Sequence, residues 1–215
     1  MKRIILLGSV LLLWVCQSAL AVEVDATPDL VSVFKSIQTY SAHFNQKIHD
    51  ANGQHVSKTQ GDIIVQRPGK FYWKTAAPDK MLIVADGKFL WTYDIELDQV
   101  TQQKLKEALG NSPAALLAGS VPQLADHFFI TYGKKNQCAQ GCDKCFVLKP
   151  KQKEATFADI IIGLSSGKLV EVRMHDPLGQ DVYTTFSNVK TNQKVNVKLF
   201  AFVPPKGVDI IQSGN

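Results

Sequence analysis

Three closely spaced cysteines are the residues with the clearest chemical potential in this sequence. Cys138, Cys142 and Cys145 are separated by three and by two residues, the spacing of the radical-SAM iron–sulfur signature. The rest of the sequence favours an all-β chain over the α/β barrel of those enzymes, and oxygen-sensitive clusters do not suit an exported protein. A zinc site would need a fourth ligand, and no further His or Cys lies close by in the sequence. We therefore expect no metal and no cofactor.

In an oxidising compartment, two of these three thiols should form a disulfide. A Cys138–Cys145 bond would join the two strands of a hairpin, whereas a Cys138–Cys142 bond would close only its tip. The sequence leaves both pairings open, and either pairing leaves one thiol over. We expect a stabilised loop here and not a catalytic site.

The histidines do not form a recognisable catalytic set. His43 and His49 alternate with apolar residues along a predicted strand, so they belong to a solvent-facing side with other polar residues. The sequence contains no GxSxG elbow, HExxH pair or phosphate-binding loop. His175 and Asp176 would make a dyad only beside a nucleophile, and the sequence does not nominate one. We expect a protein that is not an enzyme.

Arg67 is unusual because the chain is rich in lysine and holds only two other arginines, Arg3 and Arg173. It precedes Pro68, which stiffens the chain, and the aromatic run 71–73 follows. A planar guanidinium offers five donors, which suits the unpaired carbonyl groups at a helix end better than a lysine does. The pattern favours an arginine aimed at a helix, while a solvated arginine at a strand end is the alternative.

The N-terminus predicts export. Lys2 and Arg3 precede an apolar run over residues 4–15, and an Ala-x-Ala site ends at Ala21. This is typical of a cleavable signal peptide over residues 1–21, and the run is too short for a membrane anchor. The alternative is a lipoprotein signal acylated at Cys16, but such signals normally carry a small residue at the position that bulky Val15 occupies.

The remaining residues, 22–215, suit one domain with a sizeable core. No second apolar stretch reaches the length of a membrane span, so we expect a soluble exported protein and a monomer. The formal net charge is +5 and comes mostly from scattered lysines. Nucleic-acid readers usually cluster Arg and Lys, so we expect no nucleic acid as a partner. A mild positive charge fits work near anionic membrane surfaces.

Two helical segments are predicted. The first covers residues 28–38, with Thr27 as its cap and Pro28 in its first turn, and its apolar residues fall on one face. The second lies within residues 111–128. Both can cover a sheet.

About ten short strands make up the rest of the domain, with hairpin turns at Asn52-Gly53 and Asp86-Gly87. Their spacing is typical of an antiparallel meander that forms a barrel or a sandwich. The expected strands are residues 40–50, a run around 63–65, 70–75, 80–85, 88–95, 127–133, 145–150, 158–164, 168–175 and 181–189.

Several of these strands are apolar on both faces, notably residues 81–84, 89–93 and 159–164. A sheet with one solvent-exposed face would show a regular alternation of polar and apolar residues along each strand, so both faces of these strands must be covered. One interpretation is ordinary packing of helices on a sheet. The other is that the sheet curls around an apolar hollow that the helices close.

A set of ordered segments resembles the periplasmic outer-membrane lipoprotein carriers of the Lol pathway, and the resemblance covers most of residues 28–210. The most specific part is RPGKF-x-W, followed by DGK-x-LW-x-Y and then by GN-[ST]-P. The matching segments are SAHFNQKIHDANG, GDIIVQRPGKFYWKTAAPD, LIVADGKFLWTYDIELDQVT, LGNSPAALLAG, FVLKPK and FVPPKGVD.

The resemblance implies a mainly β fold, an incompletely closed antiparallel barrel of about ten to eleven strands whose apolar cavity is plugged by helices that act as a lid. It implies a periplasmic chaperone that takes up acylated lipoproteins released from the inner membrane. The implied partners are an inner-membrane ABC transporter as donor and an outer-membrane lipoprotein receptor as acceptor.

Matched position by position, the family implies that Arg67 latches the lid through backbone carbonyls near Leu117 and Ala118. Phe71 matches a position at the lipid-receiving entrance. From the strand faces we expect further cavity residues, which are Trp73, Met81, Leu82, Phe89 and Trp91, and we expect Leu116 of the second helical segment to join them. The cysteine-bearing tip, residues 134–145, departs from the family pattern and resembles an insertion.

Three alternatives are weighed against the carrier. An outer-membrane receptor of the same fold would need an acylated N-terminal cysteine, which Val15 disfavours. A periplasmic lipoprotein-sensing module of this fold should carry a second domain. An exported hydrolase would need a nucleophile beside His175 and Asp176.

Overall fold

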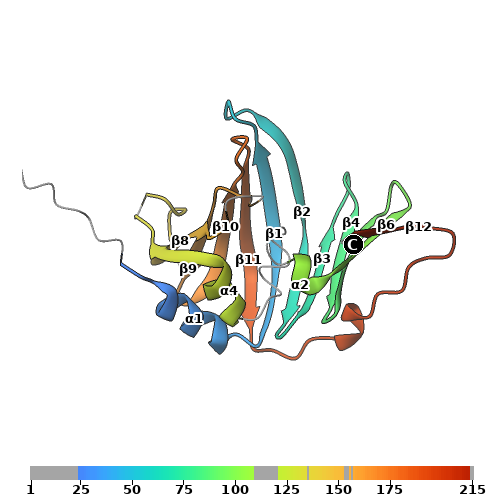
Figure 1. Ribbon diagram of the computed structural model, residues 1–215, viewed down its shortest axis with the longest axis horizontal. Coiled ribbons are helices and arrows are strands. Elements are labelled where there is room, and N and C mark those ends of the chain that lie inside the picture. The colour runs from blue at the N-terminus through green and yellow to red at the C-terminus, as the bar shows by residue number, and fades with distance from the viewer. Residues whose placement is uncertain (1–23, 109–120, 135, 153–154, 156, 214–215) are drawn as a thin grey trace, which may run out of the picture.

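The computed structural model describes residues 24–108, 121–134, 136–152, 155 and 157–213. Within these ranges twelve strands form one curved sheet with several short helices beside it (Figure 1). The helices are α1 (Thr27–Ser36), α2 (Leu105–Ala108), α4 (Val121–His127) and the 3-10 turn η1 (Val197–Phe200). The strands are β1 (Thr39–His49), β2 (His55–Gln66), β3 (Lys70–Thr75), β4 (Met81–Asp86), β5 (Phe89–Asp94), β6 (Gln99–Lys104), β7 (Phe128–Tyr132), β8 (Lys144–Pro150), β9 (Asp159–Ser165), β10 (Lys168–His175), β11 (Asp181–Thr191) and β12 (Asp209–Ser213).

The strand order is β12-β6-β5-β4-β3-β2-β1-β11-β10-β9-β8-β7. Neighbouring strands are antiparallel except for β12, which lies parallel to β6. Because β12 and β7 stand at opposite ends of this order, the sheet does not close. The predicted fold class, a mainly β chain with an incompletely closed barrel, is confirmed. None of the described helices is long and apolar enough to pass through a bilayer.

Two strands, β6 and β12, were not predicted from the sequence. β6 is mostly polar and buries only Val100 well, and all five residues of β12 are exposed. Strands with one weakly buried face carry little apolar alternation, so their sequence resembles that of a loop. The described sheet therefore has twelve strands, where ten to eleven were expected.

The hairpin between β1 and β2 turns at the predicted place. The N–H of Gly53 donates to the carbonyl of Asp50 at 2.9 Å, and the Asp50 carboxylate accepts the N–H groups of Asn52 and Gln54, each at 2.9 Å. Gly53 has a φ of 76°, a conformation that favours glycine. This turn fixes the register between β1 and β2.

Helix α1 begins one residue earlier than predicted. Thr27 is therefore not the cap but the first residue of the helix, and its backbone N–H donates to the Asp25 carboxylate at 2.9 Å. The preceding N–H of Ala26 donates to the carbonyl of Ile130 in β7 at 3.0 Å. These contacts attach the start of α1 to one edge of the sheet.

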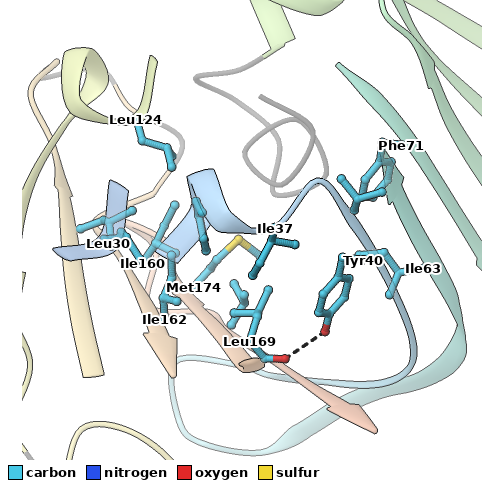
Figure 2. Packing of buried hydrophobic residues seen from close by; sticks show 14 of the residues in the cluster. Leu30, Ile37, Tyr40, Ile63, Phe71, Leu124, Ile160, Ile162, Leu169 and Met174 are labelled. Carbon is cyan, nitrogen blue, oxygen red and sulfur yellow. Dashed lines mark hydrogen bonds between the residues drawn. The ribbon is translucent and has the colours of Figure 1, made fainter. Parts of the chain in front are cut away.

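The main core lies between the concave face of the sheet and helices α1 and α4. Figure 2 shows side chains of α1 and α4 over residues of β9 and β10. At the other side of the same core, the buried Tyr40 hydroxyl donates to the carbonyl of Leu169 at 3.0 Å (Figure 2). Burial raises the pKa of Tyr40, so this hydroxyl stays protonated and acts as a donor. The helices thus cover the inner face.

The outer face of β3–β5 is covered by a different segment. After β11 the chain runs along the sheet through η1, which contacts β3 and β4, to β12 (Figure 1). Phe202 in this segment packs against Trp91 and Tyr93, with ring centroids 5.6 and 6.1 Å apart. The apolar character of both strand faces therefore has two sources, helices inside and the C-terminal segment outside.

Candidate functional site

A cavity of about 320 Å³ opens on the concave face, between strands β10, β11, β1, β2, β3 and β4. This volume lies at the lower end of the range for small-molecule sites, roughly 300–1,000 Å³. The apolar residues of its described lining are Ile48, Trp73, Met81, Ile83, Val172, Met174 and Phe186. The polar ones are Gln46, Ser57, Thr59, Thr75, Asp79 and Thr184.

Aromatic stacking forms the inner wall of the cavity. The Trp73 ring stacks on Phe44, with centroids 3.7 Å apart and an interplanar angle of 25°, and on Phe71 at 6.1 Å. Gly61 makes room for this arrangement, because a Cβ there would meet the Lys74 carbonyl oxygen at 1.9 Å and the Phe44 ring at 2.9 Å. The wall is therefore close-packed.

Two of the predicted cavity residues, Trp73 and Met81, line this cavity. Phe71 was expected at the entrance, but it is fully buried behind Trp73 and is not among the described lining residues. Its role in receiving lipid stays a prediction.

Leu82, Phe89 and Trp91 lie on the opposite face of the sheet from the cavity, so their expected place in its lining is wrong. Strand β4 pairs with β5 so that Ala85 faces Leu90 and Val84 faces Trp91. Even-numbered residues of β4 therefore share a face with odd-numbered residues of β5. The sequence gives the alternation within each strand, but the turn at residues 86–88 sets the phase between them.

On that outer face, Trp91 has structural partners. Its Nε1–H donates to the Asp86 carboxylate at 3.0 Å, and its ring lies 6.0 Å from that of Phe89. With Phe202 on top, these aromatic residues hold the C-terminal segment against the sheet.

Arg67 lies at the end of β2, beside α1. Its backbone N–H donates to the carbonyl of Gln38 at 2.8 Å, and its guanidinium carbon lies 5.0 Å from the centroid of the Phe34 ring. This distance allows a cation–π contact. Burial lowers the pKa of Arg67 to about 10, so the group is still charged at neutral pH. The sequence predicted a contact with the lid helix near Leu117 and Ala118, whereas the described contact is with α1, a different helix.

Leu116, expected in the cavity lining, lies outside the described residues, and so do Leu117 and Ala118, the expected partners of Arg67. A latch between Arg67 and their backbone stays a prediction. The described part of the second helical segment is α4, whose Leu124 is buried in the main core.

The cysteine-bearing loop covers the outer face of β8 and β9. Cys138 and Cys145 form a disulfide with Cα atoms 5.9 Å apart, and Cys142 is free. With Val147 and Ile161 the disulfide builds a small second core. The structure thus selects the pairing that joins the hairpin strands, and it places the loop on the side of the sheet that faces away from the cavity.

A buried carboxylate lies next to the free thiol. Glu171 is 2% exposed, accepts the N–H of Ala139 at 2.6 Å and a guanidinium N–H of Arg173 at 3.2 Å, and lies 4.0 Å from the Cys142 sulfur. Burial and the charge of Glu171 raise the pKa of the Cys142 thiol. Cys138, Cys142 and Glu171 lie within 4.8 Å of one another, but the sulfur of Cys138 is oxidised and is not a thiolate ligand.

His175 pairs with Asp181 and not with its chain neighbour Asp176. Its Nδ1 lies 2.7 Å from the Asp181 carboxylate, while the Asp176 carboxylate accepts the N–H groups of Leu178 and Gln180 in a turn. Asp176 has a structural role, so the hydrolase alternative, which would have needed a His175–Asp176 dyad, gains no support from this contact.

The other two predicted surface histidines differ from each other. His43 lies on the face opposite buried Phe44, with its Nδ1 3.2 Å from the Asp62 carboxylate. His49 is partly buried, with its ring 5.3 Å from that of Tyr183 and 5.8 Å from that of His55. The solvent-facing prediction is confirmed for His43 and is too simple for His49.

Sequence reasoning missed several lining residues, namely Ile48, Ile83, Val172, Met174 and Phe186. Each belongs to a strand that was predicted, and each lies on an apolar face of it. The missing information was which strands are neighbours, because the cavity joins β10 and β11 to β1 and β4.

Comparison with known proteins gives one consistent family. The family described as "Outer membrane lipoprotein carrier protein LolA" matches residues 35–203. An outer-membrane lipoprotein carrier protein of Pseudomonas paraeruginosa is 37% identical over 187 residues, which is 87% of this chain and 88% of that protein. One from Hahella chejuensis is 35% identical over 212 residues, with 99% of both chains covered.

Among solved structures, an uncharacterised conserved protein from Thermus thermophilus shares the fold. It has a TM-score of 0.52 and 11% identity, and the match covers 87% of this chain and 97% of that one. With the family match over most of the sequence and relatives above 30% identity, the chain belongs to the LolA family of outer-membrane lipoprotein carrier proteins.

Proposed function

We propose that this protein is a periplasmic chaperone that carries acylated lipoproteins from the inner to the outer membrane. The observation that supports this most strongly is the cavity on the concave face, whose wall combines Trp73, Met81 and Ile83 with apolar residues of β10 and β11. Family membership gives the substrate class, because the relatives are named as lipoprotein carriers. The signal over residues 1–21 would direct the chain to the periplasm, with cleavage after Ala21.

The energetics of the cargo explain why a carrier is needed. Burying hydrocarbon is worth roughly 0.8 kcal/mol per methylene, so one acyl chain of about fifteen methylenes gives about 12 kcal/mol. Three such chains would total roughly 36 kcal/mol, beyond the limit of about 20 kcal/mol for noncovalent binding. Release into water is therefore far too slow, and cargo must pass directly between apolar sites.

Direct transfer needs a donor and an acceptor at the two membranes. We propose an inner-membrane ABC transporter as the donor and an outer-membrane lipoprotein receptor as the acceptor, as the family resemblance implies. A carrier between them must bind its cargo loosely enough to give it up. Arg67 would contribute by stabilising a closed, empty state. This raises the free energy needed to open the cavity and so lowers the net affinity for cargo.

The test uses spheroplasts that hold newly made lipoproteins in the inner membrane. Addition of the mature protein, residues 22–215, should release lipoproteins as a soluble one-to-one complex that size-exclusion chromatography separates from free carrier. A sample without the protein should release none.

Absence of release would contradict the carrier function. If the protein nevertheless bound lipid in native mass spectrometry, the result would favour a receptor or a lipoprotein-sensing module of the same fold.

A further inference from the structure

Three polar side chains of the cavity lining form a row across neighbouring strands. The strand register pairs Thr184 of β11 with Gln46 of β1, and Gln46 with Thr59 of β2. All three residues line the cavity. They therefore lie side by side across three neighbouring strands.

Apolar residues flank this row on both sides along the strands. Two residues further along β1 and β11 on one side are Phe44 and Phe186, and on the other side are Ile48 and Val182, which are cross-strand partners in each case. Thr184 is only 4% exposed. Polar groups at such a position cost free energy unless they are hydrogen-bonded, so their presence in an apolar cavity needs an explanation.

The row satisfies only part of its own hydrogen-bonding capacity. The Gln46 side-chain amide donates to the Thr184 hydroxyl oxygen at 3.1 Å, which leaves the hydroxyl proton and the second amide N–H as donors. If the Gln46 amide is turned so that its oxygen accepts from the Thr184 hydroxyl, its two N–H groups remain as donors. The described residues provide no further partner for them. The row therefore presents two donors to whatever occupies the cavity.

Thr75, the other buried threonine of the cavity lining, differs in this respect. Its hydroxyl donates to the Asp79 carbonyl at 2.5 Å and accepts the N–H of Met81 at 2.6 Å. The Thr75 hydroxyl thus already donates and accepts a hydrogen bond within the turn between β3 and β4. The contrast singles out Gln46 and Thr184 as groups that are free to bind a ligand.

We propose that Gln46 and Thr184 bind the ester carbonyl oxygens of O-acylated cargo, while the apolar lining takes the hydrocarbon. This inference rests on the proposed carrier function and deepens it. An ester carbonyl is an acceptor without a proton to donate, so it suits the two donors that Gln46 and Thr184 leave unpaired within the described residues. The row thereby fixes where along the cavity the acyl linkage lies, and it selects esters over bare hydrocarbon.

The test compares two ligands that differ only in the carbonyl groups. The probes are 1,2-dioctanoyl-glycerol, with two ester carbonyls, and 1,2-di-O-octyl-glycerol, whose ether linkages lack them. The mature protein should bind the ester about tenfold more tightly than the ether, the size expected for one to two neutral hydrogen bonds. Isothermal titration calorimetry measures both affinities.

Variants then assign the preference to the row. The double variant Gln46→Met with Thr184→Val keeps the side-chain volumes and should bind both probes equally, at the affinity of the wild type for the ether. Thr184→Ser keeps the hydroxyl and should keep the preference for the ester. Circular dichroism on each variant establishes that it is folded.

The outcomes separate this proposal from the carrier function. Equal affinity of the wild type for ester and ether, or a preference that persists in the folded double variant, would overturn the role of the row and leave the cavity a lipid site. Binding of neither probe would contradict the lipid-carrying function itself, and the role of the row with it.

Discussion

At the scale of single residues, Arg67 connects the sheet to the helical cover. Its guanidinium lies over the Phe34 ring of α1 and is desolvated enough to lower its pKa to about 10. A charged group is held in such a place only when its surroundings compensate for lost hydration. A contact of this kind is well suited to a closed state that must open for cargo.

We predict that Arg67→Leu accepts lipoproteins but delivers them poorly. The closed, empty state loses a stabilising contact, so the loaded state becomes more stable relative to it and gives up its cargo less readily. The yield of transfer from the purified complex to acceptor membranes should fall at least tenfold, while the amount of complex formed stays near that of the wild type. Arg67→Lys is the matched control for charge, and should be intermediate because it lacks the planar fork. Normal delivery by Arg67→Leu would rule out the latch.

His175 and Asp181 give the protein a pH-dependent contact. The hydrogen bond to Asp181 raises the pKa of His175 above its ordinary value of 6.5. Since the folded state binds this proton more tightly than the unfolded state, the contact contributes its full stability below about pH 6.5 and loses it as the pH rises through the folded-state pKa.

The difference in unfolding free energy between the wild type and Asp181→Asn should therefore be largest near pH 5.5 and small near pH 9. Urea unfolding at a series of pH values measures it. A difference that grew with rising pH would contradict the assignment of this pair.

At the scale of elements, the register of β4 decides which side chains meet cargo. Met81 and Ile83 face the cavity, whereas Leu82 between them faces outward. Met81→Glu should weaken binding of an acyl probe at least tenfold, because a carboxylate in an apolar site is costly to desolvate. Leu82→Glu, the same change on the neighbouring residue, should leave binding within about twofold. Fluorescence titration with a fatty-acyl probe compares the two, and equal losses would contradict the observed register.

The disulfide loop is an element of stability on the other face. Cys138–Cys145 closes a short loop, so replacing both residues by serine should lower the free energy of unfolding by about 2 kcal/mol. Binding of the acyl probe should not change, because the loop and the cavity lie on opposite faces of the sheet. Cys142→Ser is the matched control and should cost well under 1 kcal/mol. Loss of lipid binding in the double variant would give this loop a part in cargo binding.

At the scale of the whole molecule, most of the fold could be predicted from the sequence, but only two residues of the described cavity lining, Trp73 and Met81. The helix over residues 28–38, ten strands and the turn at Gly53 follow from local pattern and turn chemistry. The family resemblance supplied the incomplete closure of the sheet. Trp73 and Met81 line the described cavity, but residues 81–84 are apolar on both faces and gave no reason to separate Met81 from Leu82.

The predictions that were wrong depend on how the strands are placed relative to one another. Phe89 and Trp91 alternate as a cavity face should, but the β4–β5 register turns them outward, where a C-terminal segment distant in the sequence covers them. The partner of His175 is similarly a cross-strand residue, Asp181, and not its chain neighbour. Such pairings depend on turn geometry and on which strands are neighbours, and the sequence of a single strand determines neither.

The central claim is that acyl chains of lipoproteins occupy the concave cavity, and site-specific cross-linking tests it most directly. A photoreactive residue would replace Ile83, inside the cavity, or Leu82, on the outer face, in the mature protein. Each carrier would then be incubated with spheroplasts that hold acylated lipoproteins and irradiated. We predict a cross-link to lipoprotein from position 83 and little or none from position 82. Equal cross-linking from both positions, or cross-linking from position 82 alone, would contradict the account.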